Sequence, residues 1–297
     1  VPTPAVGHYC ESAAVPCVLV TASHNPPEFN GIKLVGDDGV ELSVDLLERV
    51  ERRVLDDEYD DANWRTAGAE TVVEGVVDDY ADAVVAAVDR DQIADAGLTV
   101  AVDPGHGAAS VSSPRIFREL GCEVMTVNAT PDGHFPGRES EPVPENLTAL
   151  SRLVATSEAD VGIAHDGDAD RAVFVDETGA VVDGDTSFAA LADDALSPGD
   201  AVVSAVNVSQ RLVDVCDAND AALELTPIGA TNIITRTREL DDDDVHVPIA
   251  REGHGGGVFP PHPPSRGRAR ARARLPRAAP GRRGDHLVGG PERHPGG

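Results

Sequence analysis

The feature that most restricts the fold is the regular alternation of short apolar runs with longer amphipathic segments. Leu98–Val102 and Asp160–Ala164 are short, mostly apolar runs of strand length. Ser113–Leu120 and Leu147–Thr156, which lie between them, have apolar residues at helical spacing. Strands that alternate with helices form parallel βαβ units, with helices on both faces of the sheet. The sequence therefore predicts an α/β fold of consecutive βαβ domains.

The 297 residues are too many for one ordinary core and predict two to three domains. We expect a first domain over residues 1–70, a second over 71–185, a third over 186–260 and a tail over 261–297. Further strands are predicted at Val15–Val20 (buried), Ile32–Val35, Cys122–Val127, Ala201–Ser204 and Val245–Ala250. Further helices are predicted at Val44–Leu55, Val77–Val88, Thr186–Ala195 and Ser209–Ala218, and in a segment that ends at Leu240.

Acidic residues outnumber basic ones by 52 to 24, which gives a formal net charge of −28. A field of that sign repels nucleic acids and anionic membranes, so neither is expected as a partner. Lys33 is the only lysine. An acidic surplus with almost no lysine indicates adaptation to high salt, where counterions screen the self-repulsion. Ordinary solvated acidic faces would not explain the missing lysines.

The cysteines and the lack of a targeting segment indicate a cytoplasmic protein. The cysteines lie in or beside apolar segments without metal-ligand spacing, which predicts buried thiols in a reducing compartment. They are Cys10, Cys17, Cys122 and Cys216. No apolar run approaches the roughly 18–20 residues that a membrane span needs, and no segment has the pattern of a secretory signal.

A loop with a well-placed hydroxyl follows the first predicted strand. The string TASHNPPEFNGIK, residues 21–33, begins where that strand ends, and its Asn-Pro-Pro prevents a strand or helix from continuing. A phosphoryl carrier needs an oxygen on a rigid mount with cationic or proton-transferring neighbours. Ser23 has His24 beside it, and Lys33 could reach the same pocket. A serine beside Asn-Pro is, taken alone, an ordinary turn residue or helix cap.

Three aspartates alternate with small residues in HDGDADR, residues 165–171. A turn can aim Asp166, Asp168 and Asp170 at one hard cation. An acidic turn that binds nothing is the plain alternative. A calcium EF-hand loop is a sharper one, because Glu177 is the twelfth residue from Asp166. Arg171 stands at the sixth position, where that loop needs glycine, and the flanking segments are strand-like, so the sequence argues against an EF-hand.

Both strings resemble motifs of one enzyme family, the α-D-phosphohexomutases. Residues 21–33 match the phosphoserine loop of phosphoglucomutases and phosphomannomutases almost letter for letter, and residues 166–171 resemble the family's D-G-D-x-D-R metal loop. The string EGHGG at residues 252–256 is similar to its sugar-recognition loop, with Arg251 where the family usually has Gly and His254 where Asn or Ser is usual. The resemblance covers about residues 1–260, with the three motifs in family order.

The resemblance implies consecutive mixed-sheet domains of the phosphohexomutase type. It implies a mutase that moves a phosphoryl group between C1 and C6 of a hexose phosphate through a phosphoserine and a bisphosphate intermediate. One Mg²⁺ per chain, a hexose 1,6-bisphosphate primer and a monomer or homodimer are expected. Mg²⁺ would be held by Ser23, Asp166, Asp168 and Asp170. Catalytic roles are implied for Ser23, His24, Lys33 and Arg171, and sugar contacts for Glu252, His254 and Gly255.

Two departures from the family pattern bear on activity. Compared with the family pattern, the start of the first domain is expected to be missing, including an N-terminal arginine that the family uses. No phosphate-binding loop of the R-x-S-G-T-E-P type follows the third domain in this sequence, so a fourth domain is also expected to be absent. Residues 261–297 hold nine arginines and two acidic residues in a Pro- and Gly-rich context, which favours a shifted reading frame over a disordered functional tail. An inactive remnant that binds metal and a calcium-binding module remain alternatives.

Overall fold

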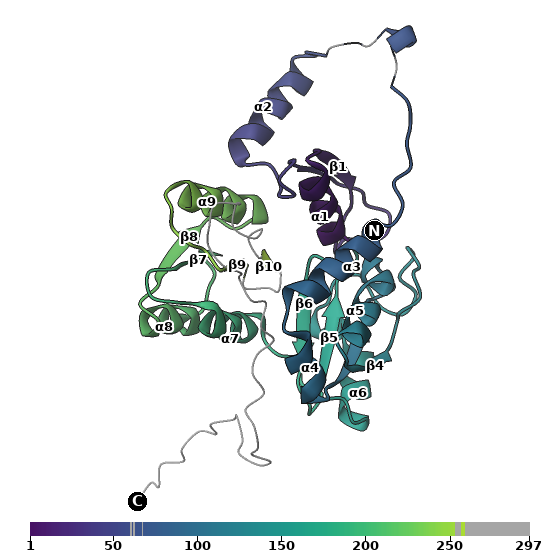
Figure 1. Cartoon of the computed structure of the whole chain (residues 1–297), viewed down its shortest axis with the longest axis vertical. Coiled ribbons are helices and arrows are strands. Elements are labelled where there is room, and N and C mark those ends of the chain that lie inside the picture. The colour runs from purple at the N-terminus through teal and green to yellow at the C-terminus, as the bar shows by residue number, and fades with distance from the viewer. Residues whose placement is uncertain (60, 62, 67, 253–256, 259–297) are drawn as a thin grey trace, which may run out of the picture.

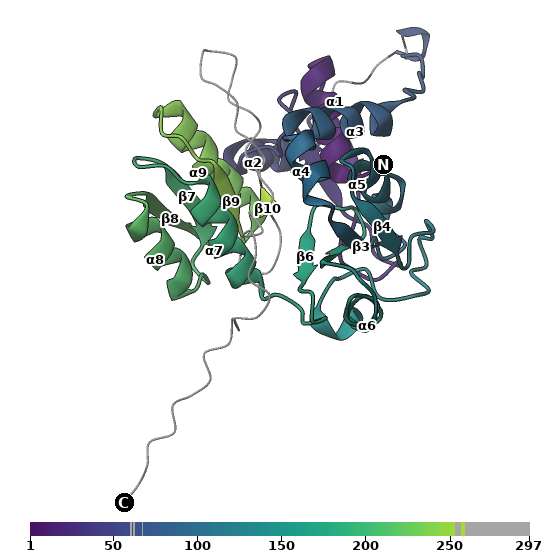
Figure 2. The ribbon, with the colours of Figure 1, turned by 60° about the horizontal axis from the view of Figure 1, so that its bottom comes forward.

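The computed structural model describes residues 1–59, 61, 63–66, 68–252 and 257–258. In this part of the chain, a small N-terminal unit precedes two larger units, each built on a four-stranded sheet with helices on both faces (Figure 1). The two larger units stay separate bodies when the molecule is turned, and they are joined by the chain between β6 and α7 (Figure 2). The tail predicted over residues 261–297 lies outside the described residues, as does most of the sugar-loop string.

The N-terminal unit pairs two antiparallel strands and adds two helices. Its elements are α1 (Thr3–Ala13), β1 (Cys17–Val20), β2 (Ile32–Val35), α2 (Val44–Leu55) and a 3-10 turn (Trp64–Thr66). Beyond the strand ends, Thr21 and Gly31 exchange backbone hydrogen bonds of 3.1 and 3.0 Å. These two bonds close the neck of the loop at residues 22–30, which we call the Ser23 loop.

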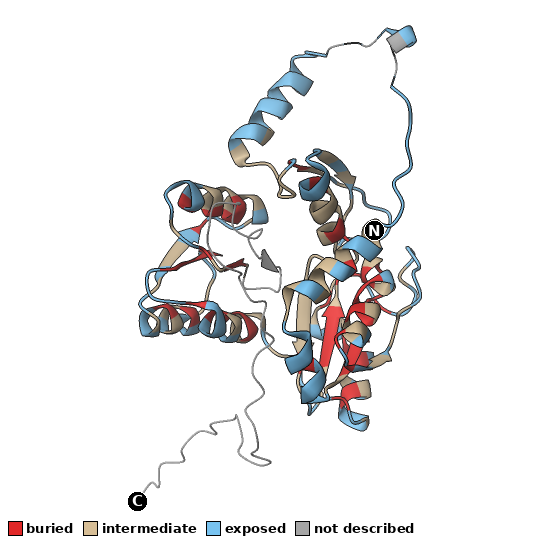
Figure 3. Ribbon diagram, viewed as in Figure 1, coloured by how far each residue is buried: buried red, intermediate tan, exposed pale blue. Residues whose placement is uncertain are grey.

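The prediction that the first strand is buried is wrong. Val18 and Val20 of β1 are each 65% exposed, because no described element covers that face of the two-stranded sheet. The helix α2 forms as predicted, but none of its residues is buried, and it is exposed along most of its length (Figure 3). The pattern of apolar residues therefore predicted the secondary structure of β1 and α2, but it did not predict how far their side chains are buried.

The second unit is a mixed sheet with the strand order β4-β3-β5-β6. The strands β3, β4 and β5 are parallel, and β6 is antiparallel to β5. Its strands are β3 (Thr99–Asp103), β4 (Glu123–Thr126), β5 (Val161–His165) and β6 (Ala172–Val175). Its helices are α3 (Val76–Ala87), α4 (Arg90–Ala96), α5 (Ser113–Glu119) and α6 (Thr148–Thr156).

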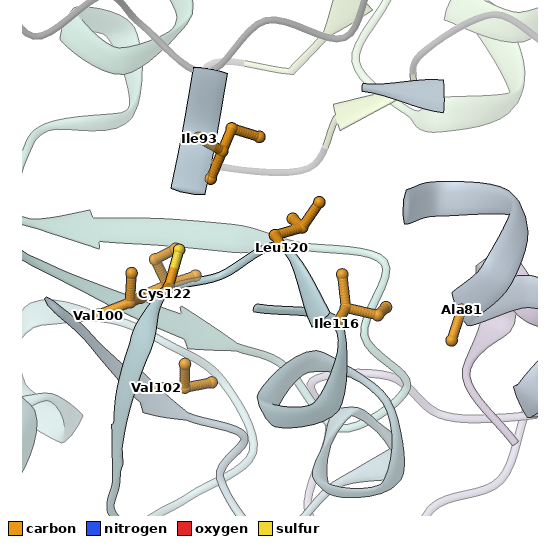
Figure 4. Close-up of a cluster of buried hydrophobic side chains, with 8 residues drawn as sticks. Ala81, Ile93, Val100, Val102, Ile116, Leu120 and Cys122 are labelled. Carbon is orange, nitrogen blue, oxygen red and sulfur yellow. The ribbon is translucent and has the colours of Figure 1, made fainter. Parts of the chain in front are cut away.

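The period-two alternation of β3 divides the interior of this unit into two cores. Val100 and Val102 point to one face, where they pack with residues of α3, α4 and α5 that include Ala81, Ile93 and Ile116 (Figure 4). Ala101 points to the other face and packs with Leu150 and Val154 of α6. Successive side chains of a strand point to opposite faces, so one strand serves both cores.

The third unit repeats this architecture with the strand order β10-β9-β7-β8. Val202 of β7 packs with Phe188 on one face, and Val203 packs with Ile233 on the other. Its strands are β7 (Ala201–Ala205), β8 (Ala222–Thr226), β9 (Ile249–Arg251) and β10 (Gly257–Val258). Its helices are α7 (Gly184–Ala195), α8 (Gln210–Ala218) and α9 (Ala230–Asp242). The predicted α/β class with helices on both sheet faces is thus confirmed.

Four helices and strands of the described residues were not predicted from the sequence. They are α1, α4, β8 and β10. The strand β9 is also shorter than the predicted Val245–Ala250. Three of the four cysteines are buried as predicted, but Cys17 is only half-buried, and all four are free thiols. Among the described residues, no helix combines the length and the apolar character needed to cross a membrane.

Candidate active site

Two loops from different units meet at the carboxyl end of β5. One is the Ser23 loop, and the other, which we call the Asp loop, is residues 166–171 between β5 and β6. The Gly167 N–H donates to the Ser23 carbonyl oxygen at 3.1 Å. The Ser23 hydroxyl donates to Asp166 Oδ2 at 2.5 Å. The carboxyl ends of sheet strands are where α/β folds place their ligands.

Glycines permit the close approach of the two loops. A Cβ added at Gly167 would collide with the carbonyl oxygen of Ser23. A Cβ added at Gly107 would lie 2.5 Å from the Gly167 oxygen, to which the Ala108 N–H donates at 2.8 Å. Ser23 itself has a φ of 47°, in the left-handed region that non-glycine residues rarely adopt. The contact with the Asp loop holds this strained backbone in place.

Two hydroxyls from the N-terminal unit hold one oxygen of Asp168. Thr21 Oγ1 donates to Asp168 Oδ2 at 2.8 Å, and Thr3 Oγ1 donates to the same oxygen at 3.0 Å. The Thr3 backbone N–H also donates to the Asp168 carbonyl oxygen at 2.8 Å. The other carboxylate oxygen of Asp168, Oδ1, is buried and has no hydrogen-bond partner. A buried carboxylate oxygen without a partner is costly unless a cation binds it.

The three aspartates of the Asp loop form a compact cluster of carboxylates. One oxygen from each of Asp166, Asp168 and Asp170 lies within 4.8 Å of the others. Burial, together with the charges of Asp170 and Asp168, raises the pKa of Asp166 to about 8. Crowded acidic oxygens of this kind suit a hard divalent cation, which would relieve the repulsion. The residues present therefore fit a divalent metal ion.

Lys33 of β2 adds a cation to one side of the cluster. Its Nζ lies 2.8 Å from Asp170 Oδ2 and 3.2 Å from Glu41 Oε1. Burial alone would lower the pKa of Lys33, but the charge and hydrogen bond of Asp170 raise the pKa above its ordinary value. Against its own burial, Asp170 has its pKa lowered by Lys33. The ammonium and the Asp170 carboxylate are thus both charged at neutral pH.

Of the remaining predicted site residues, some lie at the two loops and one lies in the third unit. His24 follows Ser23, and its buried Nδ1 has no hydrogen-bond partner. The Arg171 N–H donates to Asp166 Oδ1 at 3.0 Å, and its Nη1 lies 3.7 Å from Glu141 Oε1. Glu252 lies in the third unit, where its Oε1 accepts the Gly229 N–H at 2.7 Å. The other two predicted sugar contacts, His254 and Gly255, lie outside the described residues.

Several residues that shape the site were not predicted from the sequence. Thr21 is the first residue of the string at residues 21–33, so the sequence motif already included it, although no role was assigned to it. Thr3 lies 165 residues from Asp168 along the chain, and no local pattern connects them. Arg138 and Ser140 lie between β4 and α6, and both contact the neighbourhood of the two loops.

The Asp loop is not an EF-hand. Helices flank an EF-hand loop on both sides. Here the loop joins two antiparallel strands, with Gly162 of β5 opposite Val175 of β6. The calcium-loop alternative is therefore not supported by the local fold.

The sequence models of one family match three consecutive parts of the chain. Phosphoglucomutase/phosphomannomutase alpha/beta/alpha domain I matches residues 1–61. Domain II of the same family matches residues 78–179, and domain III matches residues 183–268.

Known proteins with similar sequence and structure carry the names of the same family. A phosphoglucomutase/phosphomannomutase of Thermococcus kodakarensis is 38% identical over 265 residues, covering 87% of this chain and 56% of the relative. A "Probable phosphoglucosamine mutase" of Methanopyrus kandleri is 39% identical, covering 80% of this chain and 52% of the relative. The crystal structure of a phosphoglucomutase/phosphomannomutase family protein from Burkholderia thailandensis matches with a TM-score of 0.74 and 27% identity, over 87% of this chain and 56% of that one.

The chain spans about half the length of the curated relatives that it matches. Within that span the matched domains follow each other in the order I, II, III. The fold, the order of the domains and the sequence relatives agree, and the chain belongs to the α-D-phosphohexomutase superfamily.

Proposed function

We propose that this chain carries the phosphoryl-transfer centre of a hexose-phosphate mutase. Ser23 would carry a phosphoryl group that moves between C1 and C6 of a hexose phosphate through a hexose 1,6-bisphosphate. The observation that carries the proposal is the contact between Ser23 Oγ and Asp166 Oδ2, 2.5 Å apart on loops of two units. The contact joins a candidate nucleophile to a carboxylate cluster that fits a metal.

In the forward half-reaction, a sugar hydroxyl oxygen would attack the phosphorus of phosphorylated Ser23. The bond from phosphorus to Ser23 Oγ breaks, a bond from phosphorus to the sugar oxygen forms, and the hydroxyl proton passes to a base. The bisphosphate then reorients in the site, and Ser23 Oγ attacks the phosphorus of its other phosphoryl group. The bond from that phosphorus to the sugar oxygen breaks, and the sugar oxygen takes the proton back from the base. The serine is regenerated in its phosphorylated form, so the two half-reactions balance.

The environment of each cationic or basic side chain supports a different role. Lys33 is held as an ammonium by Asp170, so it suits stabilisation of the phosphoryl charge more than proton abstraction. His24 has a buried ring nitrogen without a partner, which makes it our candidate for proton transfer. Arg171 would orient the site from the end of the Asp loop. Glu252 would contact the sugar hydroxyls.

Asp166, Asp168 and Asp170, together with Ser23, would hold one Mg²⁺. The cluster geometry and the buried free oxygen of Asp168 support this assignment. When bound, the cation supplies neutralisation of the charge on the transferring phosphoryl group. The sugar remains open among glucose, mannose and glucosamine phosphates, since relatives carry the names of more than one of these activities.

Labelled phosphoryl transfer tests the proposal on the chain as it is. The chain is incubated with Mg²⁺ and hexose 1,6-bisphosphates carrying a radioactive phosphate, in buffer at high salt. We expect label on Ser23, located by peptide mapping. Label is expected to disappear in Ser23→Ala and to fall by at least about a hundredfold in Asp168→Asn.

The matched control is Ser12→Ala, which removes a hydroxyl from an exposed position near the end of α1, where it donates to the carbonyl oxygen of Tyr9 in the same helix. It should accept label at the rate of the unchanged chain. A folded chain that binds Mg²⁺ but takes up no label from any of the three bisphosphates would contradict the proposal and would identify an inactive remnant.

A further inference from the structure

The segment between β4 and α6 contacts the surroundings of both site loops. Residues 138–141 of this segment, which we call the strap, include two buried side chains, Arg138 and Ser140. Between them Glu139 is exposed. Neither buried side chain belongs to the two hydrophobic cores of the second unit, so their burial serves polar contacts and not apolar packing.

Arg138 uses all five of its N–H donors. Its Nε donates to Asp103 Oδ2 at 3.1 Å, and Nη1 donates to the carbonyl oxygens of Glu139 and Ser140 at 2.8 and 3.3 Å. Its Nη2 donates to the Asp103 carbonyl at 3.2 Å and to the His165 carbonyl at 2.6 Å. His165 is the last residue before the Asp loop. The guanidinium therefore fixes the start of that loop.

Other residues are arranged around this guanidinium. Asp103, which is fully buried, also accepts hydrogen bonds of 3.2 Å from Asn128 Nδ2 to both of its oxygens. Gly105 has a φ of 56°, and a Cβ there would lie 2.5 Å from the Arg138 guanidinium. A buried ion pair contributes little net stability unless its geometry is well satisfied, and here every donor of Arg138 is satisfied. The pair therefore specifies one position for the strap.

The other end of the strap reaches the two loops directly. Ser140 Oγ donates to the carbonyl oxygen of Asn25 in the Ser23 loop at 3.1 Å. Glu141 Oε1 lies 3.7 Å from Arg171 Nη1 at the end of the Asp loop. The strap thus contacts the Ser23 loop at Asn25. It contacts the Asp loop at both ends, at His165 just before the loop and at Arg171, the last residue of the loop.

We propose that the strap positions the Ser23 loop on the Asp loop, with Arg138 and Ser140 as positioning residues. The proposal rests on the proposed transfer at Ser23, because it gives the strap the task of setting the distance between Ser23 Oγ and Asp166. Phosphoryl transfer needs its reacting groups held within about half an ångström of the productive geometry. The Ser23 loop and the Asp loop belong to different units, so a third element that contacts both restrains their relative position.

The test uses Ser140→Ala, because replacing the buried, ion-paired Arg138 could unfold the second unit. Hydrogen–deuterium exchange is measured on the metal-free chain for peptides that cover residues 22–30 and 166–171. We expect exchange in both loops to be about five- to tenfold faster in Ser140→Ala. Peptides from β7 and α8 and the midpoint of thermal unfolding should not change. Glu139→Gln, in the same strap with an exposed side chain, is the matched control and should exchange like the unchanged chain.

A second measurement follows the rate of label uptake by Ser23. Ser140→Ala should lower the maximal rate about tenfold, while the half-saturating bisphosphate concentration changes less than about twofold. Unchanged exchange in both loops overturns the strap proposal, as does faster exchange throughout the chain with a lower unfolding midpoint. If the unchanged chain takes up no label but Ser140→Ala still loosens the two loops selectively, the proposed transfer fails and the strap stands.

Discussion

Single residues at the loop contact carry tight geometric requirements. The left-handed backbone of Ser23 costs a non-glycine residue about 1–2 kcal/mol, and the hydrogen bonds to Asp166 and Gly167 offset that cost. Gly167 has no room for a side chain because the Ser23 carbonyl oxygen lies against its Cα. The hydroxyls of Thr3 and Thr21 share one oxygen of Asp168. Each of these contacts joins the first unit to the second.

Gly167→Ala should separate the two loops. The added methyl group overlaps the Ser23 carbonyl oxygen, so the Ser23 loop must move away and the hydrogen bond between Ser23 and Asp166 must lengthen. We expect a loss of about 1–3 kcal/mol in the free energy of unfolding, measured by urea titration. Label uptake at Ser23 should fall at least about a hundredfold. Gly133→Ala, at a site with open space around the Cβ, is the control and should change neither quantity.

Metal affinity should depend on pH through Asp166. Burial, together with the charges of Asp170 and Asp168, raises the pKa of Asp166 to about 8, and a metal binds only the deprotonated carboxylate. Mg²⁺ or Mn²⁺ affinity, measured by calorimetry, should therefore rise about tenfold per pH unit below pH 8 and level off above it. Affinity that is flat between pH 6 and 8 would contradict the raised pKa.

The stability of the metal-free chain should depend on pH in the opposite direction. A folded pKa above the unfolded value means that the folded state binds more protons between about pH 4 and 8. The stabilising contribution of Asp166 to the free energy of unfolding is fully present below the unfolded pKa, and it is lost as the pH rises through the folded pKa of about 8. The urea midpoint should fall over this range in the unchanged chain and fall less in Asp166→Asn.

At the scale of elements, burial separates helices that look alike in sequence. The helices α2 and α6 are both amphipathic, but α6 buries Leu150 and Val154 against the second sheet, while α2 buries nothing in the described residues. The difference arises because a hydrophobic face is buried only where a partner element lies opposite it. Both helices were predicted, but the sequence could not state which of them has such a partner.

Truncation of the two helices should have unequal effects. Leu150→Ala removes a fully buried side chain between α6 and the sheet and should lower the free energy of unfolding by about 2–5 kcal/mol. Leu46→Ala removes a side chain of α2 that is 40% exposed and should change it by less than about 0.5 kcal/mol. Chemical denaturation measures both values. A cost above about 2 kcal/mol for Leu46→Ala would show that α2 has a buried partner in solution.

At the scale of the molecule, hydrogen bonds and an ion pair join the third unit to the first two. Arg238 of α9 pairs with Asp38 and donates to the Glu41 carbonyl oxygen, and the Val44 N–H donates to Thr235 Oγ1, which links the first unit to the third. Arg251 of β9 donates to the Ala172 carbonyl oxygen at 3.2 Å, which links the third unit to the second just beyond the Asp loop.

Arg251→Met should loosen the second and third units from each other without unfolding them. The Arg251 side chain is buried, burial lowers its pKa to about 10, and its Nε has no hydrogen-bond partner, so an apolar side chain of similar length removes a costly charge. The unfolding free energy should stay within about 1 kcal/mol. Cleavage between β6 and α7 by a broad-specificity protease should become faster, because the tether to Ala172 is lost.

The matched control for this substitution is Arg236→Met. Arg236 lies on α9 of the same unit, and within the described residues it pairs only with Glu224 and Glu239, both of that unit. Its replacement should leave the rate of cleavage unchanged. Equal cleavage rates for Arg251→Met and the unchanged chain would show that Arg251 does not restrain the two units.

Local patterns in the sequence predicted most elements of the two larger units. The strand β3 and the helix α5 end within one residue of their predicted positions, because a strand of period two and a helix of period 3.6 are properties of neighbouring residues. The missed α1 has Pro4 in its first turn and Gly7 inside it, and it approaches Gly39 closely across the unit. The missed β8 is an edge strand without β-branched residues before Thr226.

The amino-acid sequence by itself determined the α/β class, the serine string and the three alternating aspartates, since each is a short-range pattern. Only the tertiary structure decided that Ser23 meets Asp166, that Thr3 holds Asp168 and that Arg138 anchors the start of the Asp loop. Those pairs are 143, 165 and 27 residues apart in the chain. No local periodicity encodes such contacts, because they arise when distant parts of the chain pack together and glycines permit close approaches of the backbone.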